Sequence, residues 1–356
     1  MPHKLAAGMV AALLAATLLA GASSTLAQTP PAGPPPIDET LVPYAGTADS
    51  VTLPDGRELH FVCMGQGSPT VILTAGMGAA AFEVWSHIQP DIAKITRVCS
   101  WDRPGWGLSD GIAGPATVKT TTADLEAALA TGKIPGPYVM VSHSLGSYES
   151  LLYTDRHPDK VAGMVLIDPS VPGQYALQQQ AMPNLMAQAD PAKSPLVQAI
   201  RKCAADIRAG SAKVGGPDPD HCFDYPPIWP AVLRDALAAK VSNPVQYETM
   251  VSFVTSLAED SPAVVNPSRN YRDTPLIVLS ATVQPEPPNL SDAQRAEIDK
   301  FNEVMGQKHD ELAALSTRGV NARVPGASHD IQHTKPQAVI DAIDQVVSEA
   351  RESKTP

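Results

Sequence analysis

Short β-rich runs that alternate with helix-like stretches constrain the fold of this chain more strongly than any other feature. Two early runs, Ser50–Leu53 and Glu58–Cys63, flank the dipeptide Asp55-Gly56, which is typical of a β-hairpin. The later runs are Thr70–Thr74, Ile95–Ser100, Tyr138–Ser142, Val161–Ile167, Leu276–Ser280 and Asn321–Val324. This alternation predicts an α/β fold with a mainly parallel sheet and helices on both of its faces.

One long segment interrupts the alternation. Between Pro172 and about Asp273 the sequence has no convincing strand but several helical patterns, namely Gln174–Ala189, Pro195–Ala209, Pro230–Val241 and Pro244–Leu257. We interpret residues 172–273 as a helical cap, inserted into a core made of residues 47–171 and 274–356. A capping-box pattern at Ser291 predicts one more helix after the cap.

The first residues are typical of a secretory signal peptide. Lys4 precedes an uncharged apolar run of 16 residues from Leu5 to Ala20, and the small residues before Ala27 suit a cleavage site. The run is shorter than the ~20 residues that a membrane-spanning helix needs. We therefore expect residues 1–27 to be removed, leaving an exported protein, periplasmic or secreted, with no stable membrane insertion. The repeated prolines of residues 28–46 predict an extended linker.

Charge and cysteine content exclude several kinds of partner and cofactor. Lys and Arg total 26 against 37 Asp and Glu, and the net charge of −11 disfavours nucleic acid and anionic membranes as partners. The sequence has no zinc-ligand spacing, phosphate loop or dinucleotide fingerprint, so we expect neither a metal nor a cofactor. Because no two cysteines have Cys-x-x-Cys spacing, we expect disulfides, in one of three pairings, among Cys63, Cys99, Cys203 and Cys222.

The strongest chemical signal is Ser142-His143-Ser144-Leu145-Gly146, where a β-rich run meets a helix-like one. A serine on a sharp turn from strand to helix is typical of a nucleophile elbow, which exposes the hydroxyl at the edge of the sheet. Ser142 stands where this pattern usually has glycine. The elbow would also place the Leu145 backbone N–H at a helix N-terminus, where it can stabilise an oxyanion.

A second turn of small residues follows the run Thr70–Thr74 and reads Ala75-Gly76-Met77-Gly78. Glycines after a strand let the chain turn tightly and present backbone N–H groups to an anion. By itself this pattern is equally typical of a simple turn. Combined with the elbow, it predicts the Met77 N–H as the second oxyanion donor.

A serine hydroxyl needs a base to become a nucleophile near neutral pH, and histidine is the side chain suited to this. His329 lies in the turn Pro325-Gly326-Ala327-Ser328-His329-Asp330, between the last β-rich run and the last helix-like stretch. This position fits the chain order nucleophile, acid, histidine. His333 is a near competitor, but it lies further from the strand end that would anchor a rigid site.

The stretch Asp102-Arg103-Pro104-Gly105-Trp106-Gly107-Leu108-Ser109, taken with these turns, resembles the serine hydrolases of the α/β-hydrolase superfamily. The resemblance covers about residues 49–172 and 275–352. It implies an eight-stranded sheet in the spatial order 1-2-4-3-5-6-7-8, with the substrate bound under the cap. In that order the strands of Cys63 and Cys99 are neighbours, which implies a Cys63–Cys99 bond and leaves Cys203 to pair with Cys222.

The acidic partner of His329 has two candidates in the sequence. In most similar hydrolases the acid follows the seventh strand, but here Leu276–Ser280 is followed by no aspartate, and Glu286 is the nearest carboxylate there. Other members supply the acid after the sixth strand, where this chain has Asp168. We choose Asp168, with Glu286 as the alternative.

The predicted function is cleavage of a carboxylic ester, or a similar acyl bond, in a small-molecule substrate through an acyl-enzyme. Amidase, aminopeptidase and other chemistries occur on the same fold, as do ligand-binding members without catalysis. Dehalogenase chemistry is disfavoured because those relatives have an aspartate where this chain has Ser144. The sequence leaves the substrate and the oligomeric state open.

Overall fold

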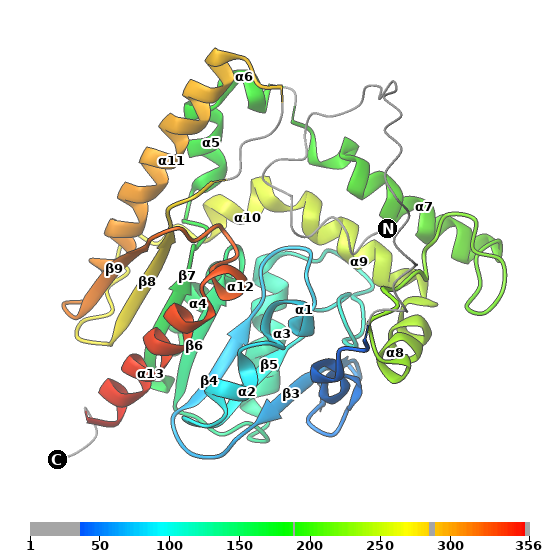
Figure 1. The fold of residues 1–356 in the computed structure, drawn as a ribbon, viewed down its shortest axis with the longest axis horizontal. Coiled ribbons are helices and arrows are strands. Elements are labelled where there is room, and N and C mark those ends of the chain that lie inside the picture. Colours follow the sequence, from blue (N-terminus) through cyan, green and yellow to red (C-terminus); the bar gives the residue numbers. More distant parts are fainter. Residues whose placement is uncertain (1–35, 188, 285–288, 353–356) are drawn as a thin grey trace, which may run out of the picture.

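The fold is known from a computed structural model that describes residues 36–187, 189–284 and 289–352. The expected signal peptide and Glu286 lie outside these residues. A seven-stranded sheet in the order β3-β5-β4-β6-β7-β8-β9 forms the centre of the molecule, with β3 antiparallel and the other strands parallel (Figure 1). Its strands are β3 (Phe61–Met64), β4 (Thr70–Thr74), β5 (Val98–Trp101), β6 (Tyr138–His143), β7 (Val161–Ile167), β8 (Leu276–Ala281) and β9 (Gly319–Val324). The predicted α/β-hydrolase fold is confirmed.

The expectation of eight strands in one sheet is wrong for the described residues. The predicted first strand, β1 (Val51–Thr52), pairs only with β2 (Glu58–Leu59) in a separate two-stranded sheet. The two sheets separate at His60, between β2 and β3. Its backbone is bonded on the β5 side, where the N–H donates to Ser109 Oγ at 2.8 Å and the carbonyl accepts from the Asp102 N–H at 3.0 Å.

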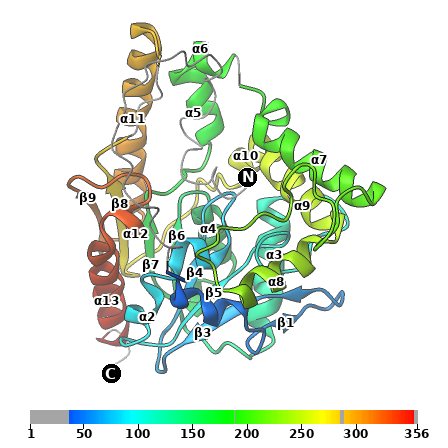
Figure 2. The ribbon, with the colours of Figure 1, turned by 45° about the vertical axis from the view of Figure 1, so that its right-hand side comes forward.

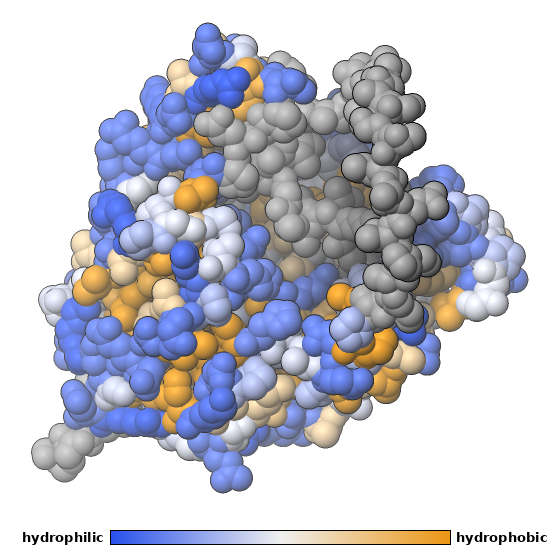
Figure 3. Space-filling view, in the orientation of Figure 1, coloured by the Kyte–Doolittle hydropathy of each residue, from blue (hydrophilic) through white to orange (hydrophobic). Residues whose placement is uncertain are grey.

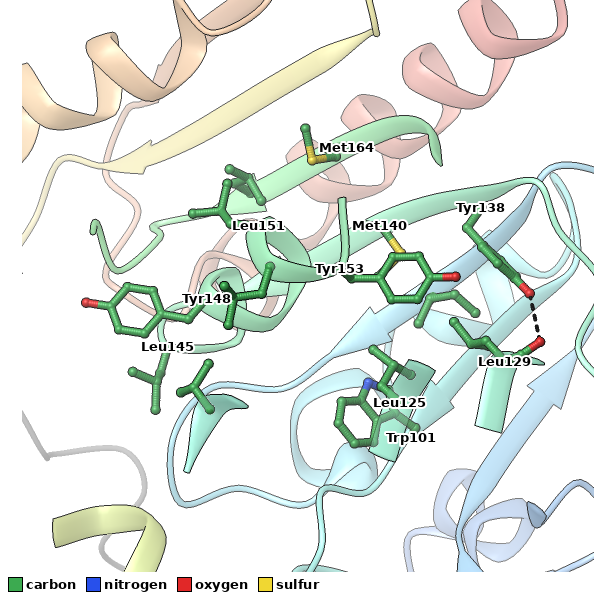
Figure 4. Packing of buried hydrophobic residues seen from close by; sticks show 14 of the residues in the cluster. Trp101, Leu125, Leu129, Tyr138, Met140, Leu145, Tyr148, Leu151, Tyr153 and Met164 are labelled. Carbon is green, nitrogen blue, oxygen red and sulfur yellow. Dashed lines mark hydrogen bonds between the residues drawn. The ribbon is translucent and has the colours of Figure 1, made fainter. Parts of the chain in front are cut away.

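Alternate residues of each strand point to opposite faces of the sheet, and each face has its own core. On β6, Val139 and Val141 belong to one core and Met140 belongs to the other. The first core is covered by α1 (Ala81–Trp85), α2 (Gln89–Ile92), α12 (Ile331–Thr334) and α13 (Pro336–Glu352). The second is covered by α3 (Val118–Ala130) and α4 (Gly146–Arg156), whose Leu125 and Leu151 lie against Met140 and its neighbours (Figure 4).

A group of helices follows β7 and lies beyond the ends of the strands (Figure 2). Its members are α5 (Gln174–Ala181), α6 (Pro183–Met186), α7 (Pro195–Ala209), α8 (Ala231–Val241), α9 (Pro244–Thr255) and α10 (Leu257–Ala263), with a short 3-10 helix at Pro191–Lys193. The described residues between β7 and β8 contain no strand, in agreement with the predicted helical insertion.

The predicted helix after the cap is α11 (Asp292–Ala313), which begins at the Ser291 capping box. It lies along α5 and α6 (Figures 1 and 2). Glu297 on α11 accepts hydrogen bonds from Nδ2 and the backbone N–H of Asn184, and from the Leu185 N–H. Hydrophilic side chains dominate the surface around α11 in the view of Figure 3.

The predicted extended linker is wrong over its described part. Residues Glu39–Ala45 form a 3-10 helix that contacts α8, and the Asp38 N–H donates to the Ile228 carbonyl at 2.8 Å. Leu41 and Tyr44 are buried, and the Tyr44 hydroxyl donates to Gln89 Oε1. Burial of these two side chains outweighs the preference of the neighbouring prolines for extended chain.

Two disulfides link the pairs that the resemblance implied. Cys63 on β3 is bonded to Cys99 on the adjacent strand β5, and Cys203 on α7 is bonded to Cys222 in the loop before α8. Within the described part of the chain, no helix is long and apolar enough to cross a membrane.

Candidate active site

Ser144 lies on the turn between β6 and α4, with a φ of 50°. A side chain in this left-handed region is strained, and the surrounding hydrogen bonds maintain it. The Ser144 N–H donates to the Ile167 carbonyl and the Ser144 carbonyl accepts from the Ser170 N–H, each at 3.0 Å. A Cβ at Gly146 would lie 2.6 Å from the Ala75 carbonyl oxygen, so only glycine fits where α4 begins. The predicted elbow geometry is thus present.

Ser142, the departure from the usual pattern, is fully buried in β6. It pairs with Thr74 and Leu166 on the flanking strands. Its Oγ has no hydrogen-bond partner among the described residues. The backbone of the strand therefore accommodates a serine here without using its hydroxyl.

His329 connects Ser144 to Asp168. Its Nε2 lies 3.0 Å from Ser144 Oγ, and its Nδ1 lies 2.6 Å from Asp168 Oδ2. With the proton on Nδ1, the ring donates to the carboxylate and accepts from the serine hydroxyl. His333, the competing candidate for the base, instead has its Nε2 3.1 Å from the Glu83 carbonyl oxygen.

Asp168 follows β7 and also has a positive φ, of 39°. Its N–H donates to the Leu279 carbonyl, and its Oδ1 accepts from the Ala281 N–H at 2.9 Å. Ala281, the last residue of β8, therefore supplies a backbone donor to the carboxylate of Asp168. The alternative acid, Glu286, lies outside the described residues.

The interaction between Asp168 and His329 shifts their two pKa values in opposite directions. Burial opposes the charge of Asp168, but the hydrogen bond and charge of His329 outweigh it and lower the pKa of this carboxyl below its usual value. Burial likewise opposes protonation of His329, but the hydrogen bond and charge of Asp168 raise the pKa of the imidazole. The ring is thus a stronger base than a free histidine, which favours proton transfer from a serine.

The loop of Met77 lies against the elbow. A Cβ added to Gly76 would lie 3.3 Å from Ser144 Cβ and 2.9 Å from His143 Nδ1. Neither Met77 nor Leu145 donates its backbone N–H to an acceptor within the described part of the chain. Within the described residues, no protein acceptor competes for the two predicted oxyanion donors.

Two further histidines support the site and were not identified from the sequence. His143 Nε2 donates to the His329 carbonyl at 3.1 Å, and burial followed by repulsion from His329 lowers the pKa of His143 to about 4. His309 on α11 contacts the Pro169 carbonyl and Ser280 Oγ. His143 could have been identified from the sequence, because it directly precedes Ser144. His309 could not, because it lies on α11, far from the other site residues in sequence.

The comparisons with known proteins agree with the fold. The sequence profile of the family described as "alpha/beta hydrolase fold" matches residues 69–197. The lipase LipV of Mycobacterium tuberculosis is 26% identical over 247 residues, which are 68% of this chain and 85% of LipV. Three other curated relatives are uncharacterized proteins, and the chain spans only 16%, 42% and 38% of their lengths.

Solved structures with low sequence identity share the architecture. An esterase from Thermogutta terrifontis superposes with a TM-score of 0.51 at 18% identity, over 85% of this chain and 98% of the esterase. An ancestral haloalkane dehalogenase gives a TM-score of 0.59 at 15% identity, over 85% of this chain and 99% of that protein. These neighbours differ in activity, so the likeness describes the fold alone.

Proposed function

We propose that this chain, which has the α/β-hydrolase fold, is an exported serine hydrolase that cleaves carboxylic esters through an acyl-enzyme. The observation that carries the proposal is the continuous hydrogen-bonded chain from Ser144 through His329 to Asp168. Three side chains in this arrangement can activate a hydroxyl, accept its proton and fix the tautomer of the base.

In the proposed mechanism, Ser144 Oγ attacks the ester carbonyl while His329 Nε2 takes its proton. Asp168 stays ionised and stabilises the imidazolium that forms. The Met77 and Leu145 N–H groups stabilise the oxyanion of the tetrahedral intermediate. His329 then protonates the leaving alcohol, and a water activated by the same ring releases the acid and restores Ser144.

One curated relative supports an ester substrate. LipV, which is 26% identical, is named a lipase. The ancestral dehalogenase shares the fold, but Ser144 stands where dehalogenase-type relatives have an aspartate. Two disulfides support export, because such bonds form and persist in oxidising compartments.

A fluorophosphonate probe and a panel of chromogenic substrates test the proposal. We expect the probe to form one covalent adduct, located on Ser144 by peptide mapping, and p-nitrophenyl esters to be cleaved faster than the matched p-nitroanilides. Faster anilide cleavage would favour the amidase alternative. Absence of both labelling and turnover would favour a ligand-binding protein without catalysis.

The pH dependence of kcat/KM provides a separate prediction. Only neutral His329 can accept the Ser144 proton, so the rate is lost as pH falls through the His329 pKa. Since Asp168 raises that pKa, we expect the midpoint of the acid limb to lie above the ordinary value of about 6.5. His143 cannot produce this limb, because its pKa of about 4 keeps it neutral. A midpoint below 6.5 in a pH titration of kcat/KM would contradict the assignment of His329.

A further inference from the structure

We propose that Arg103 is the positioning residue of the oxyanion hole, because it fixes the carbonyl groups that set the direction of the Met77 N–H. The inference rests on the proposed function and assigns a role to a residue that the sequence analysis left within a scaffold motif. Arg103 follows β5 and is almost fully buried, with 3% of its surface exposed.

Every hydrogen bond of the Arg103 guanidinium is made inside the protein. Nη1 donates to the Gly76 carbonyl at 2.9 Å, and Nη2 donates to the Ala75 carbonyl at 2.7 Å. Nε and Nη2 also donate to the two carboxylate oxygens of Glu149, each at 2.6 Å. The planar fork of donors thus holds two consecutive carbonyls and a carboxylate in one fixed geometry.

The hydrogen bond to the Gly76 carbonyl also fixes the direction of the Met77 N–H, because both groups belong to one planar peptide unit. The peptide between Gly76 and Met77 is trans, so its C=O and N–H point in opposite directions. Because the Gly76 carbonyl points to Arg103, the Met77 N–H must point away from Arg103. The Gly76 backbone lies so close to the elbow that a Cβ added to it would be 3.3 Å from Ser144 Cβ. In the proposed role, Arg103 thus fixes the direction of an N–H that lies beside the nucleophile.

Glu149 connects Arg103 to the helix that carries the second oxyanion donor, the Leu145 N–H. It lies on α4, the helix whose N-terminal turn carries the Leu145 N–H, and it is fully buried. Thr121 Oγ1 on α3 donates to Glu149 Oε1 at 2.7 Å and helps to fix the carboxylate. The Arg103 and Glu149 pair thus links the loop of one oxyanion donor to the helix of the other.

A buried ion pair contributes little to stability compared with apolar residues of the same volume. The free-energy cost of burying Arg103 and Glu149 is better explained if the pair fixes the geometry of the oxyanion hole. The guanidinium also lies 5.0 Å from the ring of Phe253 on α9, so a helix of the cap covers it and excludes water.

The variant Arg103→Lys separates positioning from simple stability. An ammonium keeps the charge opposite Glu149 but cannot hold two carbonyls and both carboxylate oxygens in one plane. We expect kcat on a p-nitrophenyl ester to fall about 10²–10³-fold, the effect of losing one oxyanion donor, while KM changes less than about threefold. Affinity for a substrate-like trifluoromethyl ketone, which forms an oxyanion adduct with serine, should fall in parallel. Affinity for the matched methyl ketone should not.

Two companion variants exclude a loss of folding as the cause. Arg269→Lys changes a similar buried arginine, which binds Asp155 near the C-terminal end of α4 and the Val264 carbonyl, and it should lower Tm without lowering kcat. The double variant Arg103→Met/Glu149→Met removes both buried charges, so its Tm should fall less than that of a variant that leaves one buried charge unpaired, and it should still show the loss in kcat.

A stable double variant with kcat within threefold of wild type would overturn the role of Arg103. So would an Arg103→Lys protein whose loss lies only in KM or Tm. These outcomes differ from failure of the proposed function, in which the wild-type protein itself would not react with the fluorophosphonate probe.

Discussion

Replacing Ser144 with alanine is expected to lower kcat by about 10⁶-fold, with little change in KM. The variant lacks the only hydroxyl within hydrogen-bond distance of His329 Nε2 among the described residues, so no acyl-enzyme can form. A rate about 10³–10⁴-fold above that in water should remain, because substrate binding and the Met77 and Leu145 donors are unaffected. The measurement is steady-state turnover of a p-nitrophenyl ester, with labelling by the fluorophosphonate probe.

Ser150→Ala is the matched control for this variant. Ser150 lies on α4, directly after the same elbow, and its buried Oγ has no hydrogen-bond partner among the described residues. Its removal should therefore leave both turnover and labelling unchanged. A Ser144→Ala protein that retained more than about 1% of wild-type kcat would mean that another residue is the nucleophile.

The parts of this fold that could be predicted from the sequence are those that depend on local pattern. The run Val161–Ile167 has the bounds of β7, and the Ser291 capping box marks the start of α11. Ser144 was recognisable because strand, small residues and helix follow one another without interruption. Asp55-Gly56 likewise predicted the hairpin of β1 and β2. The separation of this hairpin from the main sheet had no comparable local signal, because it occurs at His60, whose backbone bonds to residues more than 40 positions away.

The candidate site shows the same limit. Asp168 could be preferred only because no aspartate follows the run Leu276–Ser280, and the stabilising Ala281 N–H became visible only in the structure. Arg103 belonged to a recognisable motif, yet its role depends on two carbonyls from one distant segment and a carboxylate from another. Contacts of this kind follow from the tertiary fold, which fixes distances that spacing along the chain does not encode.

Asp168→Asn is expected to lower kcat by about 10⁴-fold while leaving the fold intact. Asparagine tolerates the positive φ of 39° at this position, and its side-chain oxygen can still accept from the Ala281 N–H. Its amide would then donate to His329 Nδ1, which forces the proton onto Nε2. A ring protonated on Nε2 cannot accept the Ser144 proton, so the loss appears in kcat and not in KM.

The same substitution should also move the acid limb of kcat/KM to lower pH. Asp168 raises the pKa of His329 through a hydrogen bond and through its charge. Asparagine has no charge, and its amide donates to the neutral ring instead of accepting from the protonated one. Glu286→Gln is the matching change in the alternative acid and should leave both the rate and the limb unaltered. If Asp168→Asn kept kcat within tenfold of wild type and Glu286→Gln abolished it, the acid would be Glu286, in the segment that follows β8. A loss in Asp168→Asn alone, together with a lower limb, would place it after β7, because only the hydrogen-bond partner of Nδ1 can control both the tautomer and the basicity of His329.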